Sequence, residues 1–523
     1  MCIFKYVLKN KKKMLWCVLL FYEYQLKRIQ NDCFYLKIMF MNKYILISLL
    51  FISVFSVSCS KEEKVLPETF QVTSADEINA FIWKGLNSYY LWQKEVPTLA
   101  DTRFKNLEEK HIYFRRYSSS EATFNSLLKK PEDRFSWIVD DYVALENSFQ
   151  GINLSTGLDF GLVRYQDNSS NIFGYVRYVI PNSSAAAEKM ERGMIFNTIN
   201  GEILTDQNYS SLLFGDNIAV SVGLAAYNGG NPQANGTQYD LTKTEITENP
   251  IAIAKVIETD NKKIGYLLYN QFVSSYDVDL NTKFDYFKSE NIDDLIIDLR
   301  YNGGGSVQSA TYLGSMVAGQ FPNEVYSKQR WNEKIVAQVS SDFLTNRFAT
   351  KITTSDSEVA INSLELPRVY FIVSGSSASA SELVISSLNP YIAVRVIGVE
   401  TVGKQVGSVT LYDSDNLQRS GANLNTKHSY AMQPIVLEIT DKNGINYPGG
   451  IIPEVNFSGV EIKENFGNLG VLGERTDPLL DSALKYITTG AKATRQKNSV
   501  TTQEEFFNSK LATPAGNNMY SKF

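Results

Sequence analysis

The segment Gly375–Glu382, "GSSASASE", stands between the apolar runs "RVYFIVS", 368–374, and "LVISSLNPY", 383–391. The first run has the composition of a buried strand, and the second has the apolar spacing of a helix. Four serines with no bulky side chain between such elements predict a sharp strand-to-helix turn rather than a linker. A turn of this kind can leave one hydroxyl exposed at the helix N-terminus, which is the geometry that a nucleophilic serine needs.

A second strand-to-helix turn lies upstream, in "NIDDLIIDLRYNGGGS", 291–306. Its apolar strand ends in three glycines, 303–305, and a helix-like segment follows at 307–319. Backbone N–H groups at such a turn can hold a phosphate or an oxyanion. The turn fails as a dinucleotide fingerprint, because Gln308 stands where a glycine is required. A purely structural tight turn is the alternative.

A third motif, "GVETVGKQ", 398–405, has the glycine and lysine spacing of a phosphate-binding P-loop. However, Gln405 occupies the place of the Ser or Thr that would hold magnesium. The next residues, "VGSVTLY", are β-branched and strand-like, whereas a P-loop continues into a helix. The sequence therefore argues against nucleotide binding, and Lys404 must have another role.

A serine nucleophile needs a base, and the supply of histidine is poor. The chain has only His111 and His428, so a Ser-His-Asp triad is not favoured, and we expect His428 to be an ordinary strand residue. A lysine is the alternative base, provided that its pKa falls from about 10.4 by about three units, which costs roughly 4 kcal/mol. Lys404 lies among Val402, Gly403 and Val406, where burial would have this effect.

The three motifs together carry a family resemblance. "DLRYNGGG", "FIVSGSSASASEL" and "GVETVGKQVGS" occur in the order and spacing of the carboxyl-terminal processing peptidases, also called tail-specific proteases. In that family the middle serine of the second motif is the nucleophile and a lysine 25 residues later is the base. The resemblance thus implies a dyad of Ser379 and Lys404, with no metal and no cofactor.

Further site residues follow from the same resemblance. Backbone N–H groups of Ala380 and of Gly304 or Gly305 would hold the oxyanion. The family has a glutamine four residues after its lysine, but this chain has Ser408 there. Ser408 and Gln405 are therefore both candidates to orient the lysine.

The neighbours of the two turns have simpler expected roles. Ser377 and Ser381 are expected to pack or to cap the helix, and Glu382 to compensate the helix dipole. Asp298 and Arg300 are expected to fix the glycine turn through local pairing.

The resemblance covers about residues 75–490 and implies a multidomain α/β protein. With 523 residues, 44% of them hydrophobic, the chain is long enough for several domains. We expect an N-terminal helical domain at 74–150, a PDZ-like β-rich domain at 154–246, and a crotonase- or ClpP-like α/β catalytic core at 250–490. The polar tail, 491–523, is predicted to lack regular structure.

The PDZ-like domain has an expected role in peptide binding. PDZ domains add an extended peptide to one open strand edge. The backbone around Phe160, Gly161 and Leu162 is the expected edge, and disordered C-terminal tails of proteins are the expected substrates. The family's Gly-Asp motif is Gly193-Met194 here, so the sequence leaves peptide affinity open.

The front of the chain predicts export. Met41 begins a short basic segment, a thirteen-residue apolar run follows at 45–57, and Ser58 and Cys59 come after it. Residues 41–58 thus resemble a bacterial lipoprotein signal peptide, with Cys59 lipidated and 59–73 as a tether. Residues 1–40 are interpreted as an over-extended start. A transmembrane anchor is the alternative, and the expected location is the cell envelope, on the periplasmic side or the cell surface.

Charge and cysteine usage agree with this location. All four cysteines stand at or before residue 59, so the folded domains have no thiol to oxidise. The formal net charge is −5, and residues 1–58 hold nine of the 51 basic residues but only two of the 56 acidic ones. The body is therefore acidic, which argues against nucleic acid as a partner.

The sequence therefore predicts a lipid-anchored serine endopeptidase that acts on protein or peptide substrates, on the C-terminal tails of exported proteins. Two other functions stay open. One is a catalytically idle PDZ lipoprotein that only binds peptides, and the other is a crotonase-like acyl-CoA enzyme.

Overall fold

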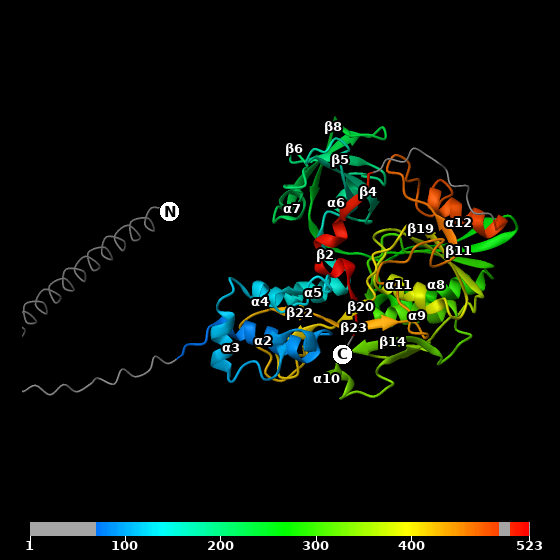
Figure 1. Cartoon of the computed structure of the whole chain (residues 1–523). Coiled ribbons are helices and arrows are strands. Elements are labelled where there is room, and N and C mark those ends of the chain that lie inside the picture. The colour runs from blue at the N-terminus through cyan, green and yellow to red at the C-terminus, as the bar shows by residue number, and fades with distance from the viewer. Residues whose placement is uncertain (1–69, 491–502, 522–523) are drawn as a thin grey trace, which may run out of the picture. The chain divides into compact units, whose positions relative to one another are not determined.

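The computed structural model describes residues 70–490 and 503–521, and from Gln71 onward the chain forms one compact unit. Figure 1 shows the order of its elements. The predicted signal peptide, Cys59 and most of the tether lie outside the described residues. Within the described ranges, no helix has the length and apolar character needed to cross a membrane.

A helical domain comes first, as the sequence predicts. Its helices are α2 (Ser74–Tyr89), α3 (Leu107–Phe114), α4 (Ser120–Ser126) and α5 (Tyr142–Phe149). Thr73 caps α2, because its hydroxyl accepts a hydrogen bond from the N–H of Asp76 at 3.2 Å. The buried side of α2 carries Phe81, Ile82 and Leu86. One short strand, β1 (Trp137–Val139), pairs with β22 (Ala431–Gln433), which in turn pairs with β21 (Leu411–Tyr412).

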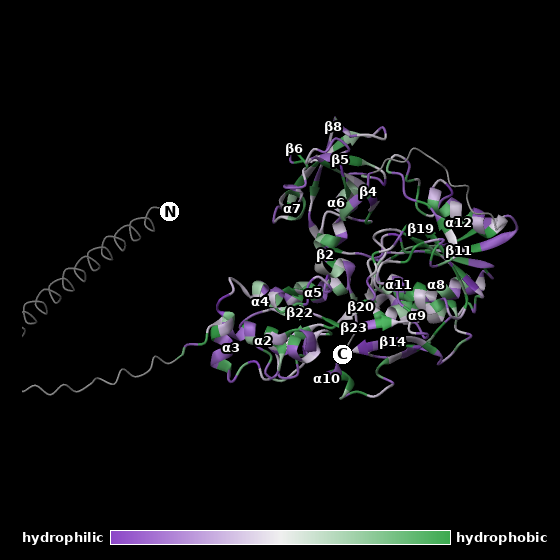
Figure 2. Cartoon of the chain, in the orientation of Figure 1, coloured by the Kyte–Doolittle hydropathy of each residue, from purple (hydrophilic) through white to green (hydrophobic). Residues whose placement is uncertain are grey.

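The α/β core is built on a six-stranded sheet. Its strands, in spatial order, are β10 (Ile251–Thr259), β11 (Lys262–Tyr269), β12 (Asp294–Asp298), β18 (Arg368–Val373), β19 (Ala393–Gly398) and β24 (Gly459–Glu461). The β10–β11 pair is antiparallel, and the other pairs are parallel. Parallel strands are covered on both faces, and these strands accordingly read as continuous apolar runs. Figure 2 shows this apolar character around β11 and β19.

Alternate side chains of each strand pack against different helices. On one face, Leu267, Leu295 and Phe371 belong to a buried cluster with helices α8 (Asp277–Ser289), α9 (Val307–Val317) and α11 (Ala380–Leu388). On the other face, Tyr266 and Ile296 pack against α12 (Pro478–Thr489). The two turns singled out in the sequence lead from this sheet into α9 and α11.

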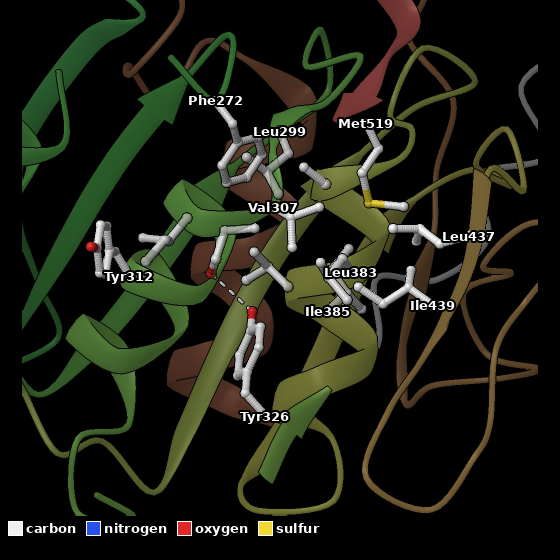
Figure 3. Close-up of a cluster of buried hydrophobic side chains, with 14 of the residues drawn as sticks. Phe272, Leu299, Val307, Tyr312, Tyr326, Leu383, Ile385, Leu437, Ile439 and Met519 are labelled. Carbon is white, nitrogen blue, oxygen red and sulfur yellow. Dashed lines mark hydrogen bonds between the residues drawn. The ribbon is translucent and has the colours of Figure 1, made fainter. Parts of the chain in front are cut away.

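A second sheet of six strands adjoins these turns. Its order is β13 (Gly305–Ser306), β26 (Met519–Tyr520), β20 (Val406–Ser408), β23 (Ile435–Thr440), β14 (Val325–Trp331) and β15 (Thr345–Arg347). Figure 3 shows Leu437 and Ile439 of β23 together with Leu383 of α11 and Met519 of β26 in one apolar cluster. Short elements α10 (Glu333–Val336), β16 (Lys351–Thr353) and β17 (Glu358–Ala360) lie in the connections.

The β-rich domain is built on a seven-stranded sheet. Its strands are β3 (Leu158–Arg164), β4 (Ile172–Val179), β5 (Ile195–Ile199), β6 (Glu202–Ile203), β7 (Ala219–Ala226), β8 (Gln233–Thr242) and β25 (Glu505–Asn508). Two short helices, α6 (Ser184–Ala187) and α7 (Tyr209–Phe214), accompany it. The domain is joined to the rest of the chain by an antiparallel pair, β2 (Ile152–Ser155) with β9 (Thr244–Thr247).

The expectation that the tail lacks regular structure is wrong for residues 503–521. Strand β25 extends the β-rich sheet, two 3₁₀ turns follow (Ser509–Ala512 and Pro514–Asn517), and β26 lies in the second sheet. The reason is tertiary: the polar composition gives this segment no core of its own, but strands of two other domains supply its backbone partners.

Candidate active site

The turn after β18 leads from strand to helix as predicted, with α11 beginning directly after Ser379, but the hydroxyl expected to be exposed is buried. Ser379 has φ 68°, a left-handed value that is costly for a residue with a side chain. Its side chain is fully buried, and Oγ has no hydrogen-bond partner among the residues that the structure describes. A strained, buried and unpaired hydroxyl at a helix N-terminus is typical of a functional site rather than of a structural turn.

The serines around Ser379 have structural roles, as expected. Ser377 Oγ donates to the carbonyl oxygen of Leu299 at 2.7 Å, and Ser381 Oγ donates to that of Asn302 at 3.0 Å. Ser374 Oγ is hydrogen-bonded to the carbonyl oxygen of Arg300. These bonds hold the serine-rich turn against the start of the glycine turn.

The glycine turn lies directly against the nucleophile. Gly304 and Gly305 have φ values of 118° and 132°, which favour glycine. A Cβ at Gly304 would lie 2.6 Å from Ser379 Cβ, so only glycine fits at this approach. The N–H of Gly304 donates to Asn302 Oδ1 at 2.9 Å, whereas Ala380 is the first residue of α11 and has no acceptor within the helix for its N–H. The predicted oxyanion donors thus all lie on the two turns that meet at Ser379.

Lys404 lies on the loop between β19 and β20, with 1% of its surface exposed. Burial lowers the pKa of its amine to about 7, against the opposing effect of the negative charges on Asp133 and Glu382. The ring of Phe135 lies 4.9 Å from Nζ. Both Asp133 and Phe135 come from the helical domain, which thereby helps to set the pKa of the lysine.

Glu382 joins the nucleophile turn to the lysine loop. Its buried carboxylate accepts hydrogen bonds from the N–H groups of Ser379 at 2.7 Å, Gly403 at 2.7 Å and Lys404 at 2.8 Å. The hydroxyl of Thr401 is a fourth partner. Burial raises the pKa of this carboxyl, and the four donors act against that effect. The role expected from the sequence, compensation of the helix dipole, misses this link between the two loops.

The two candidates for orienting the lysine make no direct bond to it in the described part of the chain. Gln405 is buried, and neither its Nε2 nor its Oε1 has a hydrogen-bond partner there. Ser408 Oγ contacts Gln433 Oε1 at 2.5 Å and Asn518 Oδ1 at 3.1 Å. Asn518 Oδ1 in turn accepts a hydrogen bond from Lys404 Nζ at 3.3 Å, so Asn518 lies between Ser408 and the lysine.

The sequence also makes predictions for Arg300, which precedes the glycine turn, and for His428. Arg300 is fully buried and pairs with Asp298 at 2.6 Å, as predicted, and also with Asp477 at 2.8 Å at the start of α12. This network fixes the strand end that leads into the glycine turn. His428 lies outside the strands, contrary to expectation. It lies 3.1 Å from Asp413 and stacks on Phe81 of the helical domain, so its contacts are structural.

The predicted peptide-binding edge is also present. In an antiparallel ladder, Gly161 of β3 pairs with Asn508 of β25, and Leu162 pairs with Phe507. The N–H of Phe160 donates to Ser509 Oγ at 3.1 Å. The edge that the sequence assigns to a peptide is thus occupied by the chain's own segment.

Comparison with known proteins places the site in a family. Residues 77–137 match the peptidase S41 N-terminal domain, and residues 263–445 match peptidase family S41. The second match contains both turns and the lysine. Over these two segments the chain is similar to peptidase family S41. In this family of serine peptidases, the fold is a mixed α/β arrangement with an N-terminal helical region, as observed here.

The individual proteins that the chain resembles are distant from it in sequence. The "Probable CtpA-like serine protease" of Staphylococcus saprophyticus is 23% identical over 62% of this chain and 60% of its own. The carboxyl-terminal-processing protease of a Picosynechococcus strain is 26% identical over 31% and 34%. The alignments thus span less than two thirds of these relatives. A solved structure of an S41 protease from Bacteroides fragilis matches 81% of this chain and 99% of its own. The TM-score is 0.59 and the sequence identity is 22%, so the two chains share a fold.

The pKa of Lys404 predicts how the rate depends on pH. A lysine base must be neutral, so kcat/KM is expected to rise with pH through a midpoint at about 7 and to fall about tenfold per pH unit below it. Replacing Glu382 by Gln removes a negative charge that raises this pKa. Glu382→Gln is therefore expected to move the midpoint to lower pH. It should also lower the plateau rate about tenfold, because the NH2 group that replaces one oxygen leaves two donors without their acceptor.

Glu400→Gln is the matched control, since Glu400 is exposed on the same loop as Lys404. The pH-rate profile of this variant should coincide with that of the parent chain. A midpoint that does not move in Glu382→Gln would contradict the link between Glu382 and the lysine.

Proposed function

We propose that this chain is a serine endopeptidase in which Ser379 is the nucleophile and Lys404 is the general base. The observation that carries the proposal is that two unusual groups lie on two loops joined by Glu382. One is a buried hydroxyl without a hydrogen-bond partner among the described residues, and the other is a buried amine with a pKa of about 7. A structural turn requires neither group.

The proposed reaction is acyl transfer to water. Neutral Lys404 takes the proton of Ser379, and Oγ attacks the carbonyl carbon of the scissile peptide bond. The protonated lysine then gives this proton to the leaving amine as the C–N bond breaks. A water molecule, deprotonated by the same lysine, attacks the acyl-enzyme ester, and Ser379 regains its proton when the acid product leaves.

The oxyanion formed in both steps needs donors near Ser379. The N–H groups of Ala380 and Gly305 lie on the two turns beside the nucleophile and suit this role, whereas the N–H of Gly304 already donates to Asn302 Oδ1. One such donor typically contributes about 3–4 kcal/mol to transition-state stabilisation. The positive end of α11 adds a favourable dipole at the same place.

The proposed substrates are extended C-terminal segments of proteins. Strand β3 offers a backbone edge to such a segment, which is how PDZ domains bind peptides. A cavity of about 350 Å³ adjoins that edge, and its apolar lining includes Phe160, Phe196, Phe214 and Val222. An apolar side chain near the end of the substrate would fill it.

Two alternative functions make different demands. A peptide-binding protein without activity would use β3 but would not need a lysine with a lowered pKa. An acyl-CoA enzyme would need a site for an adenine nucleotide, whereas the groups beside Ser379 in this structure pair with an extended peptide segment. These observations favour the peptidase.

The dyad predicts the effects of three substitutions. Ser379→Ala and Lys404→Ala should each lower kcat for a peptide substrate by at least about a thousandfold, and the double variant should be no worse, because the two groups act as a unit. Lys404→Arg should be equally inactive, since a guanidinium does not lose its proton near neutral pH. Peptide-cleavage assays measure kcat for each variant. Unchanged circular dichroism spectra would show that the variants remain folded.

His428→Ala serves as the control for the dyad, because His428 contacts the helical domain. It should retain the parent rate. Full activity in Lys404→Ala combined with loss of activity in His428→Ala would replace the dyad by a histidine mechanism.

The substrate class predicts dependence on the last residues of the substrate. A disordered test protein should lose at least about tenfold in kcat/KM when its C-terminal three residues are made acidic, because the cavity beside Phe160 is largely apolar. The same change at an internal position, remote from the cleavage site, is the control. Equal cleavage of both forms would contradict recognition of tails.

We also propose that the mature chain begins at a lipidated Cys59 and is held at the bacterial cell envelope. The signal-like segment 41–58 supports this. Metabolic labelling with a fatty acid analogue should label the chain, and Cys59→Ser should abolish the label. If intact-mass analysis of the envelope-associated chain showed that residues 1–58 are still attached, the proposal would be refuted.

A further inference from the structure

The segment 503–521, here called the tail segment, follows the route assigned above to a substrate. It first adds β25 to the open edge of β3 in the β-rich domain. It then crosses to the α/β core, where β26 pairs in parallel with β13 of the glycine turn and with β20 beyond the lysine loop. Figure 1 shows this segment in red between the two domains. One continuous stretch therefore contacts both predicted peptide-binding regions.

At the active site the tail segment lies beside Ser379 and contacts Lys404. A Cβ at Gly304 would lie 2.7 Å from the carbonyl oxygen of Asn518 and 2.9 Å from Ser379 Oγ, so this carbonyl lies beside the nucleophile. Lys404 Nζ donates to the carbonyl oxygen of Asn517 at 2.6 Å. The amine that should accept the proton of Ser379 is thus hydrogen-bonded to the tail segment instead.

Side chains of the tail segment are buried beside the dyad. Met519 is fully buried and points into the apolar cluster with Leu383 and Leu437 (Figure 3). Tyr520 stacks on Phe149 of the helical domain, with ring centroids 4.3 Å apart. The groove therefore holds an extended backbone with an apolar side chain followed by an aromatic one.

The anchor in the β-rich domain also reaches the nucleophile turn. The carboxylate of Glu505 pairs with buried Arg177 of β4 at 2.5 Å and accepts from the hydroxyl of Tyr175. Arg177 also donates to Ser376 Oγ at 2.6 Å, and Asn508 Nδ2 contacts the same oxygen at 3.3 Å. Because Ser376 belongs to the turn that carries Ser379, the tail segment bridges the β-rich domain and the nucleophile turn.

From this path we infer that the tail segment is an intramolecular ligand of the substrate groove, and that a peptide substrate must displace it before Ser379 and Lys404 can act. The groove beside β13 and β20 takes an extended peptide with an apolar residue at the place of Met519 and an aromatic residue at the place of Tyr520. The inference rests on the proposed function of the dyad for its effect on rate, but binding of the tail segment can be measured without any activity.

The first test separates binding from chemistry. In a Ser379→Ala background, a chain ending at Thr502 and the full chain are titrated with a fluorescent peptide of residues 503–523. Fluorescence polarisation should show binding to the shortened chain that is at least tenfold tighter than to the full chain, whose own segment competes. Equal affinity for the two chains, or no binding to the shortened one, would overturn the inference.

The second test uses activity. With Ser379 intact, the chain ending at Thr502 should cleave an unrelated fluorogenic peptide with kcat/KM at least tenfold above that of the full chain. Added peptide 503–523 should reverse the gain by raising KM rather than by lowering kcat. Equal rates for both chains would overturn the inference, whereas no activity in either chain, together with tight binding in the first test, would refute only the proposed function.

A point variant keeps the inference testable if the shortened chain does not fold. Glu505→Ala removes the carboxylate that joins the tail segment to Arg177 and should raise kcat/KM several-fold in the full chain. Glu504→Ala is the matched control, because Glu504 is exposed and its one ion pair among the described residues is with Lys463, at 4.0 Å. A rate for Glu505→Ala equal to that for Glu504→Ala would count against the tail segment as a competitor.

Discussion

The site depends on a single buried carboxylate. Glu382 accepts hydrogen bonds from the backbone of Ser379 on one loop and from Gly403 and Lys404 on another. These loops lie 25 residues apart in the sequence, and each alone would be free to adopt other conformations. The cost of burying the carboxylate is offset by its four donors, so any movement of one loop leaves a buried charge with fewer partners. The mutual position of the nucleophile and the base is therefore fixed by backbone groups rather than by contact between their side chains.

Neighbouring residues hold the two turns and the lysine in place and leave the hydroxyl of Ser379 free of hydrogen bonds to the described residues. Small residues allow the serine-rich turn and the glycine turn to approach each other, and the hydroxyls of Ser377 and Ser381 hold the turns together. Of the four serine hydroxyls in the segment 375–382, only that of Ser379 is left without a hydrogen bond among the described residues. The buried network of Arg300 with Asp298 and Asp477 fixes the strand end below. The helical domain contributes from outside, because Asp133 and Phe135 lie beside the lysine and complete its burial.

Much of this could be predicted from the sequence, because the decisive signals are local. The composition of 368–391 predicts a strand, a turn and a helix, and the structure confirms them as β18, the turn at Ser379 and α11. The role of Glu382 could have been suspected only from its place in the first helical turn, since its partners at 401–404 come from another loop. The regular structure of residues 503–521 was not predictable from their polar composition, because the two strands in this segment pair with strands more than a hundred residues away. The interaction of Ser408 with Lys404 through Asn518 depends on the same segment.

The central claim is that Ser379 is activated by a lysine that is neutral near pH 7. The most direct measurement is the rate of covalent labelling by a fluorophosphonate as a function of pH, with the modified residue identified by peptide mass spectrometry. The Ser379–Lys404 mechanism predicts a single adduct on the peptide that contains Ser379, with a labelling rate that rises through a midpoint near pH 7 and vanishes in Lys404→Ala. Labelling of another serine, or a rate at Ser379 that is unchanged in Lys404→Ala, would contradict it.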